Sequence, residues 1–194
     1  MKKILILCGH PAQSSYSDAL VDAYTRGALE KAADVRVHKL ADMTFDTDFG
    51  QSRFRDAKPL EPDLQAFWQD LQWADHFVLL HPLWWGGMPA KLKGLIDRVF
   101  LPGNTFRYVK GKSLPEGLLK GKTAEVFVTA DTPPLFLSLV YGNGIRKQTE
   151  RQILKFCGMK MKGYHVIGTM HGASDAKRAG WLKKAATRGR KAAA

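Results

Sequence analysis

The chain contains 194 residues, 45% of them hydrophobic, and Lys and Arg outnumber Asp and Glu by 30 to 18. That length is enough to bury a sizeable core, so we expect one domain over residues 1–194. No apolar run reaches the roughly 18 residues of a membrane span, and the N-terminus lacks the features of a signal peptide. We therefore expect a cytoplasmic protein without stable membrane insertion.

Two further compositional features narrow the class of protein. The two cysteines, Cys8 and Cys157, lack the spacing of metal ligands, so we predict no metal site. The segment from Lys177 to the end carries seven basic residues and no acidic one. We interpret it as an amphipathic helix that begins at Asp175 and frays from about residue 186, solvated and without a nucleic-acid partner.

Strand-like and helix-like patterns alternate along the chain. Short apolar or β-branched runs predict strands over Lys3–Cys8, Val35–Leu40, His76–His81, Thr123–Thr129 and Gly163–Gly168. Helical patterns are found over Asp18–Ala32, Pro62–Trp73, Pro89–Val99, Ile145–Phe156 and Asp175–Arg188. This alternation is typical of an α/β fold with a parallel sheet covered on both faces. In such folds, ligands bind beyond the carboxyl ends of the strands.

The loop after the first strand, Gly9–Ser17, has the composition of a phosphate-binding turn. It precedes a predicted helix, whose start offers unpaired N–H groups and the positive end of the helix dipole. Ser14, Ser15 and Ser17 add hydroxyl donors, and His10 can donate from its ring. The loop contains neither a glycine-rich dinucleotide fingerprint nor a Walker lysine, so it is not a nucleoside-triphosphate loop.

The segment after the third strand carries the strongest signal in the chain. It runs from His81 to Phe100 and reads HPLWWGGMPAKLKGLIDRVF, with Pro89 suited to the first turn of a helix. Trp84 and Trp85 thus stand where a strand ends and a helix begins. We expect them to form one wall of a flat slot at the carboxyl edge of the sheet.

Together the two segments resemble the flavodoxin-like NAD(P)H:quinone oxidoreductases of the DT-diaphorase type. That family carries H-x-x-x-x-S-[FY]-[NS] after its first strand, matched here by His10–Ser17. It carries P-x-x-W-x-x-P-A-x-x-K-x-x-I-D-[RK]-V after its third strand, matched by Pro82–Val99. The resemblance implies a doubly wound, five-stranded parallel sheet of order 2-1-3-4-5, with its switch point between the first and third strands.

The resemblance also implies a bound flavin, FMN or FAD, with NAD(P)H as electron donor and a quinone or another planar molecule as acceptor. Flavin contacts are expected from three loops. These are His10, Ser14, Ser15, Tyr16 and Ser17, then Pro82, Leu83, Trp84, Trp85 and Gly86, then Thr129, Ala130, Asp131 and Thr132. The third loop departs from the family's T-T-G-G pattern, because it continues into two prolines that cannot donate and contains the negative Asp131.

The mechanism that the resemblance implies is ping-pong. NAD(P)H gives hydride to the flavin and leaves, and the acceptor then takes the hydride in the same slot. A proton donor to the acceptor oxygen would help, and Tyr108, Tyr141 and His81 are the candidate catalytic residues. The family also implies a homodimer, with the aromatic loop Asn104–Val109 near the interface.

Three alternatives stay open, and one of them is a flavin-free scaffold, which the sequence Asp131-Thr132-Pro133-Pro134 suggests. A one-electron flavodoxin-like carrier normally has a T-x-[ST]-G-N-T phosphate loop and an acidic composition, and this chain has neither. A regulatory flavoprotein subunit of a membrane transporter is compatible with every motif described above.

Overall fold

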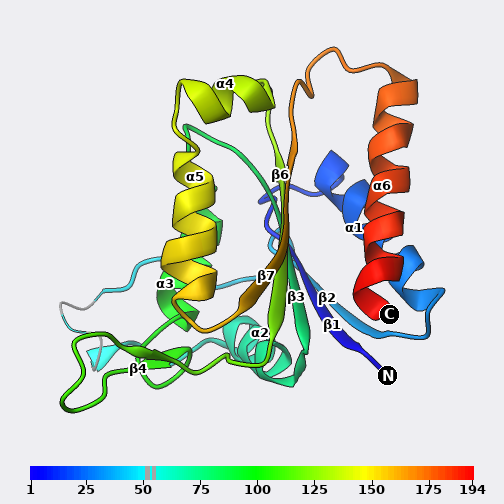
Figure 1. Cartoon of the computed structure of the whole chain (residues 1–194). Helices are drawn as coiled ribbons and strands as arrows, with labels where there is room; N and C mark the ends of the chain where they lie inside the picture. The colour runs from blue at the N-terminus through cyan, green and yellow to red at the C-terminus, as the bar shows by residue number, and fades with distance from the viewer. Residues whose placement is uncertain (51–52, 54–55) are drawn as a thin grey trace.

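The computed structural model describes residues 1–50, 53 and 56–194, and its centre is a five-stranded sheet (Figure 1). The strands are β1 (Lys3–Cys8), β2 (Asp34–Lys39), β3 (His76–Pro82), β6 (Thr123–Thr129) and β7 (Lys160–Ile167). All neighbours pair in parallel, in the order β2-β1-β3-β6-β7. Because β6 and β7 are the fourth and fifth strands of this sheet along the chain, this is the flavodoxin-like order 2-1-3-4-5, and the predicted fold class is confirmed.

Helices cover both faces of the sheet (Figure 1). One face is covered by α1 (Tyr16–Leu29) and α6 (Asp175–Ala193). The other is covered by α2 (Pro62–Trp73), α3 (Ala90–Val99) and the segment formed by α5 (Gly144–Arg146) and η2 (Lys147–Lys155). A short helix, α4 (Pro134–Leu139), and a small hairpin, β4 (Phe106–Arg107) with β5 (Glu116–Gly117), complete the elements.

The alternation of side chains along the strands builds two cores. In β1, Ile4 and Ile6 face α1 and α6, whereas Leu5 and Leu7 face α2 and α3. Every residue of β3 is buried, as expected for a strand near the middle of a parallel sheet. The sheet is therefore rigid at the carboxyl ends of β1 and β3, where the predicted ligand loops begin.

The C-terminal helix differs from its prediction. We expected fraying from about residue 186, but α6 continues to Ala193. Arg188 Nε bonds Glu125 Oε1 at 2.5 Å, and Arg190 pairs with Glu30 at 2.8 Å. These ion pairs, together with close backbone packing of α6 against α1 at Gly27 and Gly189, hold the last turns in place.

The helix predicted over Ile145–Phe156 also takes another form. After the single turn of α5, the backbone follows a π-helix, η2, from Lys147 to Lys155. Its two buried side chains, Thr149 and Leu154, are five residues apart, which is the spacing of i→i+5 hydrogen bonding. The helix α4 and the β4–β5 hairpin were not predicted at all.

Arg98 in α3 organises the long loop that precedes α2. Its side chain is buried, and it donates to both carboxylate oxygens of Glu61 and to the backbone carbonyls of Asp46 and Pro59. A basic residue in the last turn of a helix would ordinarily lie at the surface, but Arg98 is buried and paired with Glu61, whereas its neighbour Asp97 forms an exposed ion pair with Lys93. Within the described residues, no helix has the length and apolar character needed to cross a bilayer.

Candidate active site

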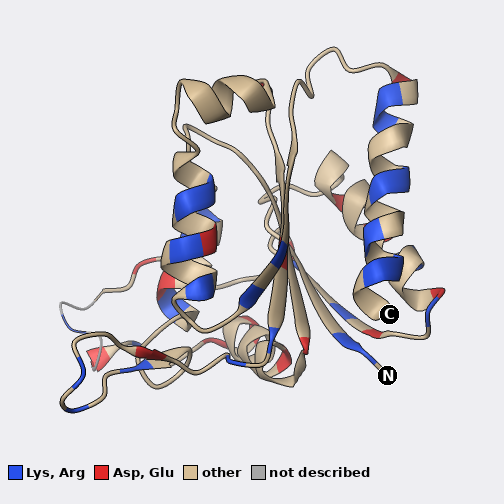
Figure 2. Cartoon of the chain, viewed as in Figure 1, with Lys and Arg blue, Asp and Glu red and all other residues tan. Residues whose placement is uncertain are grey.

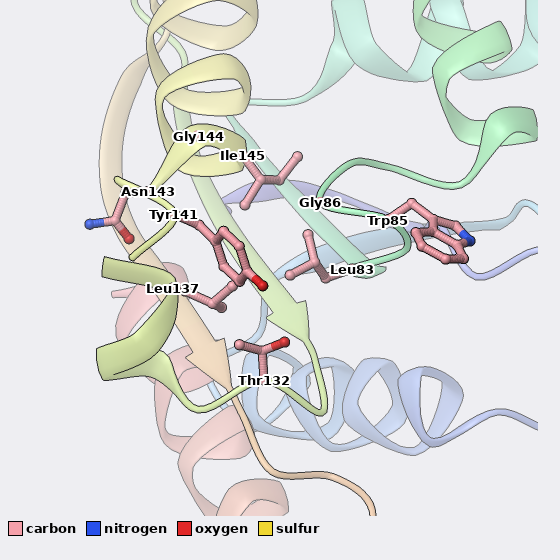
Figure 3. Close-up of a pocket in the computed structure, with 9 residues that line it drawn as sticks. All are labelled: Leu83, Trp85, Gly86, Thr132, Leu137, Tyr141, Asn143, Gly144 and Ile145. Atoms are coloured by element: carbon pink, nitrogen blue, oxygen red, sulfur yellow. The ribbon is translucent and has the colours of Figure 1, made fainter. Parts of the chain in front are cut away.

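Two adjoining hollows lie at the carboxyl edge of the sheet, and they share Leu83. The small hollow, about 210 Å³, lies between the start of α1 and the ends of β3 and β6. The large cavity, about 550 Å³, lies between the loop after β3 and the segment from α4 to α5 (Figure 3). The small hollow is lined by His10, Tyr16, Ser17, Pro82, Leu83, Trp84, Thr129, Ala130, Asp131 and Met170. The large cavity is lined by Leu83, Trp85, Gly86, Thr132, Leu137, Tyr141, Asn143, Gly144 and Ile145.

The start of α1 supplies the donors of the small hollow. The Ser17 side chain is 98% buried at this wall of the hollow, and its hydroxyl makes no hydrogen bond to any described residue. The ring of His10 packs edge-on against Trp84, and its Nδ1 lies 3.0 Å from the backbone oxygen and 3.1 Å from the backbone nitrogen of Ala12. When Nδ1 accepts that N–H, the ring proton is on Nε2, where it can be donated to a ligand. These groups can bind an anion.

Ser15 has a different role from the one predicted for it. Its backbone N–H and its hydroxyl both donate to Asp18 Oδ2, each at 2.8 Å, and so close a capping box at the start of α1. Lys39 at the end of β2 lies 3.3 Å from the other carboxylate oxygen. Burial opposes ionisation of Asp18, but the Ser15 and Lys39 donors outweigh it and lower its pKa. The Ser15 hydroxyl is therefore already used, whereas the Ser14 and Ser17 hydroxyls make no hydrogen bond among the described residues, and of these two only Ser17 lines the small hollow.

The loop after β3 is a tight two-residue turn. Trp84 N–H donates to Gly87 O and Gly87 N–H donates to Trp84 O, at 3.0 and 2.9 Å. This geometry requires positive φ at both central residues, and Trp85 and Gly86 have φ of 50° and 75°. The fully exposed ring of Trp85 points away from Leu83 and Tyr141, whereas Trp84 borders the small hollow (Figure 3). We had expected the two indoles to form one wall of a slot, but they point in different directions and do not.

The loop after β6 joins the two hollows. Leu83 N–H donates to Thr129 O at 2.7 Å, which fixes this loop to the one after β3. The carboxylate of Asp131 accepts a hydrogen bond at 2.7 Å from the backbone N–H of His171, in the loop between β7 and α6. Thr132 reaches the large cavity, while Ala130 and Asp131 line the small hollow. The loop that departs from the family pattern thus lines both hollows.

The three candidate proton donors are placed very differently. Tyr141 lines the large cavity, and its hydroxyl is directed towards Thr132 (Figure 3). Tyr108 is exposed on the β4–β5 hairpin, packs edge-on against Phe106, and lines neither hollow. His81 is fully buried, and its Nδ1 bonds Pro82 O at 2.9 Å. Burial lowers the pKa of His81 to about 4, so the ring is neutral at pH 7. We had expected His81 to face the site, but it lines neither hollow.

Three lining residues, Asn143, Gly144 and Ile145, were missed by the sequence analysis. Ile145 supplies an apolar wall from α5, as Leu137 does from α4, and Asn143 and Gly144 lie in the turn between them. The sequence Gly142-Asn143-Gly144 was the available signal, because Gly and Asn tolerate the positive φ of 58° and 55° found at its first two positions. Among the described residues, no side chain lining the large cavity carries a charge, which suits a flat, neutral ligand.

Comparison with known proteins agrees with this architecture. An NAD(P)H oxidoreductase of Haemophilus influenzae is 26% identical over 186 residues, covering 94% of this chain and 91% of the relative. An FMN-dependent NADH:quinone oxidoreductase of Cereibacter sphaeroides is 32% identical over 109 residues, covering 56% of this chain and 53% of the relative. The solved structure of an NAD(P)H:quinone oxidoreductase from Methanothermobacter marburgensis superposes with a TM-score of 0.83 at 26% identity, covering 97% of this chain and 95% of that one.

The model of one protein family, described as having a flavodoxin-like fold, matches residues 2–188. Sheet order, the position of the hollows at the switch point between β1 and β3, and this match all agree. The chain belongs to the flavodoxin-like fold family.

Proposed function

We propose that the chain is a single flavin-binding domain that acts as an NAD(P)H:quinone oxidoreductase by a ping-pong mechanism. The observation that carries the proposal is the pairing of two unlike hollows. One offers, at a helix start, the hydroxyl of the buried Ser17, which has no partner among the described residues, and the other is wide, with no charged side chain among its described lining residues. The names of the relatives described above support the same activity.

The residues of the small hollow fit the phosphate of a flavin. Ser17 and His10 would donate to it, and the free N–H groups at the start of α1 would add the helix dipole. Gly9 lets the backbone of this loop pass close to β3 and α3, because a Cβ there would lie 2.7 Å from Leu92 Cδ2 and 3.0 Å from Leu80 O. When bound, the flavin supplies the hydride-transfer chemistry that the side chains themselves lack.

The large cavity would hold the planar parts of the reactants. Leu83, Leu137 and Ile145 provide apolar surface that excludes water. Tyr141 would bind the acceptor oxygen and hold a proton at its hydroxyl. Because one cavity serves donor and acceptor alike, NAD(P)H and the quinone would occupy it in turn.

We also propose a homodimer. The β4–β5 hairpin presents exposed Tyr108 beside Phe106, in the aromatic loop that the family places near its interface. Light scattering of the purified chain at micromolar concentration should give the mass of two chains, and a monomer would contradict this part of the proposal.

The test of the function is steady-state kinetics on protein reconstituted with flavin. NADH or NADPH is varied at several fixed concentrations of a soluble quinone, and parallel double-reciprocal lines are expected. Intersecting lines would mean that both substrates bind together, and would refute ping-pong order. Bound flavin without turnover of any quinone would favour the regulatory or electron-carrier alternative.

A further inference from the structure

The net charge of the molecule is concentrated in one part of the chain. Residues 144–194 contain thirteen basic and two acidic residues, and so supply +11 of the total of +12. The preceding 143 residues contain seventeen basic and sixteen acidic residues and are almost neutral. Such asymmetry is typical of proteins that associate with a polyanionic surface.

These basic residues lie together in space. They belong to α5, η2, β7 and α6, and β7 is the edge strand of the sheet, with α5 and η2 on one side of it and α6 on the other (Figure 2). We call the exposed Lys and Arg side chains of these four elements the basic edge. Acids pair with four of the thirteen basic residues: Glu150 with Arg146 and Lys155, Glu125 with Arg188, and Glu30 with Arg190. The other nine form no ion pair with a described acid, so the region keeps a large positive charge.

An apolar helix adjoins the basic edge. In α4, Leu137 is buried, whereas Leu135 and Leu139 are 69% and 75% exposed, and Val140 follows them at the surface. The start of α4 packs on the end of β7, where a Cβ on Gly168 would lie 2.5 Å from Pro134 Cδ.

Lysines of the basic edge flank this helix. On the η2 side, Lys147 Nζ lies 3.8 Å from where a Gly142 side chain would begin, in the turn that follows α4. On the α6 side, Lys177 Nζ bonds Thr169 Oγ1 at 2.9 Å, directly after β7. Neither ammonium group is paired with an acid among the described residues.

We propose that α4 and the basic edge form a docking surface for an anionic lipid bilayer. The exposed leucines enter the headgroup region, Lys147 and Lys177 contact lipid phosphates, and the rest of the basic edge attracts the molecule at longer range. Lipid is favoured over nucleic acid because aliphatic side chains on the contact helix gain free energy in a bilayer and not against a phosphate backbone. This consequence rests on the proposed function: docking would bring the large cavity, which Leu137 and Tyr141 line, to the membrane surface, where lipid-soluble quinones partition.

The first test is cosedimentation of the full chain with vesicles. We expect binding to phosphatidylcholine vesicles in which about a third of the lipid is phosphatidylglycerol, and a steep loss as salt rises from about 0.05 to 0.5 M. Charge reversal of Lys147 and Lys177 together should lower the partition coefficient about 25-fold or more, since each surface lysine contributes about fivefold. The matched control is Lys110→Glu with Lys112→Glu, two exposed lysines on the β4–β5 connection, which should change it much less.

The second test concerns α4 itself. The exposed pair Leu135→Ser with Leu139→Ser should lower partitioning about tenfold with an unchanged circular dichroism spectrum, and Leu114→Ser, equally exposed elsewhere, should not. Equal losses in both charge-reversal pairs, or no loss in the α4 pair, would overturn the proposal. So would tighter binding to duplex DNA than to the anionic vesicles, or conversion of a dimer to a monomer by the α4 substitutions, because a second copy would then cover α4.

Discussion

Replacing Arg188 with Met should destabilise the protein through one buried carboxylate. Glu125 in β6 is fully buried and accepts from Arg188 Nε at 2.5 Å, His165 Nε2 at 2.6 Å and the Tyr24 hydroxyl at 3.0 Å. A Cβ on Gly163 would lie 2.6 Å from His165 Nε2 and 2.8 Å from Glu125 Oε1, so glycine there keeps the space between them open. The substitution removes the permanent positive charge of this cluster and leaves the carboxylate under-compensated.

The magnitude follows from burial. Removing one partner of a buried ion pair costs about 3–5 kcal/mol, because the other charge stays desolvated. Arg188 is 25% exposed and two other donors remain, so we expect a smaller loss than this range, about 2–3 kcal/mol at pH 7. For a chain of this size that corresponds to a fall in Tm of roughly 5–10 °C.

The pH dependence has a definite sign. Burial opposes ionisation of Glu125, but His165, His76 and Arg188 outweigh it and hold its pKa well below the usual range. A depressed carboxyl pKa contributes stability that is complete above the unfolded value, about 4.5, and is lost as pH falls towards the folded value. Arg188→Met raises the pKa of Glu125, so its stability deficit relative to wild type should shrink as pH falls from about 6 to 3.

Urea unfolding of both proteins across this pH range measures the deficit, with Arg190→Met as control. Arg190 is on the same helix but pairs with the exposed Glu30, so its loss should cost under about 1 kcal/mol. Equal effects of the two substitutions, or a deficit for Arg188→Met that widens towards acid pH, would refute the assigned role of Glu125.

Two further predictions concern packing. Arg98→Met should lower the free energy of unfolding by about 3 kcal/mol in urea titration, because Glu61 loses its buried partner, whereas Lys93→Met, which breaks an exposed pair, should cost under about 0.5 kcal/mol. Gly27→Ala should cost about 1–3 kcal/mol in thermal unfolding, because its Cβ would overlap the backbone of Ala186, and Gly180→Ala, with open space around it, should stabilise α6 by about 0.5–1 kcal/mol. A Gly27→Ala variant as stable as wild type would contradict the close approach of α1 and α6.

The elements that carry the site could be predicted because each has a strong local signal. Lys3–Cys8 and His76–His81 are continuous apolar runs, and the turns after them are marked by Gly, Pro and Ser, so strand ends and loops coincide with the structure. The order of the strands in the sheet was inferred from the family resemblance that the motifs in these loops carry, and so no long-range contact had to be predicted.

The remaining features depend on tertiary contacts that no local pattern encodes. The last turns of α6 contain mostly Ala and basic residues, which indicate fraying, but Arg188 reaches a carboxylate 63 residues away. Ser15 and Ser17 are chemically equivalent in the sequence, and only the position of Asp18 shows which hydroxyl is used and which is free. The outward direction of the Trp85 ring depends on its positive φ, which the sequence Trp84-Trp85-Gly86-Gly87 does not reveal, because a bulky residue rarely adopts that conformation.

The central claim is that the small hollow binds the phosphate of a flavin through Ser17, and one titration tests it most directly. Purified wild-type protein, Ser17→Ala and Ser15→Ala are each titrated with FMN and with FAD, and binding is followed by quenching of flavin fluorescence. A hydrogen bond to a charged group contributes about 1.5–3 kcal/mol, so Ser17→Ala should raise the Kd about tenfold or more. Ser15→Ala should lower helix stability by about 1 kcal/mol and leave the Kd close to that of wild type. Equal flavin affinity in wild type and Ser17→Ala, or a larger loss in Ser15→Ala, would contradict the account.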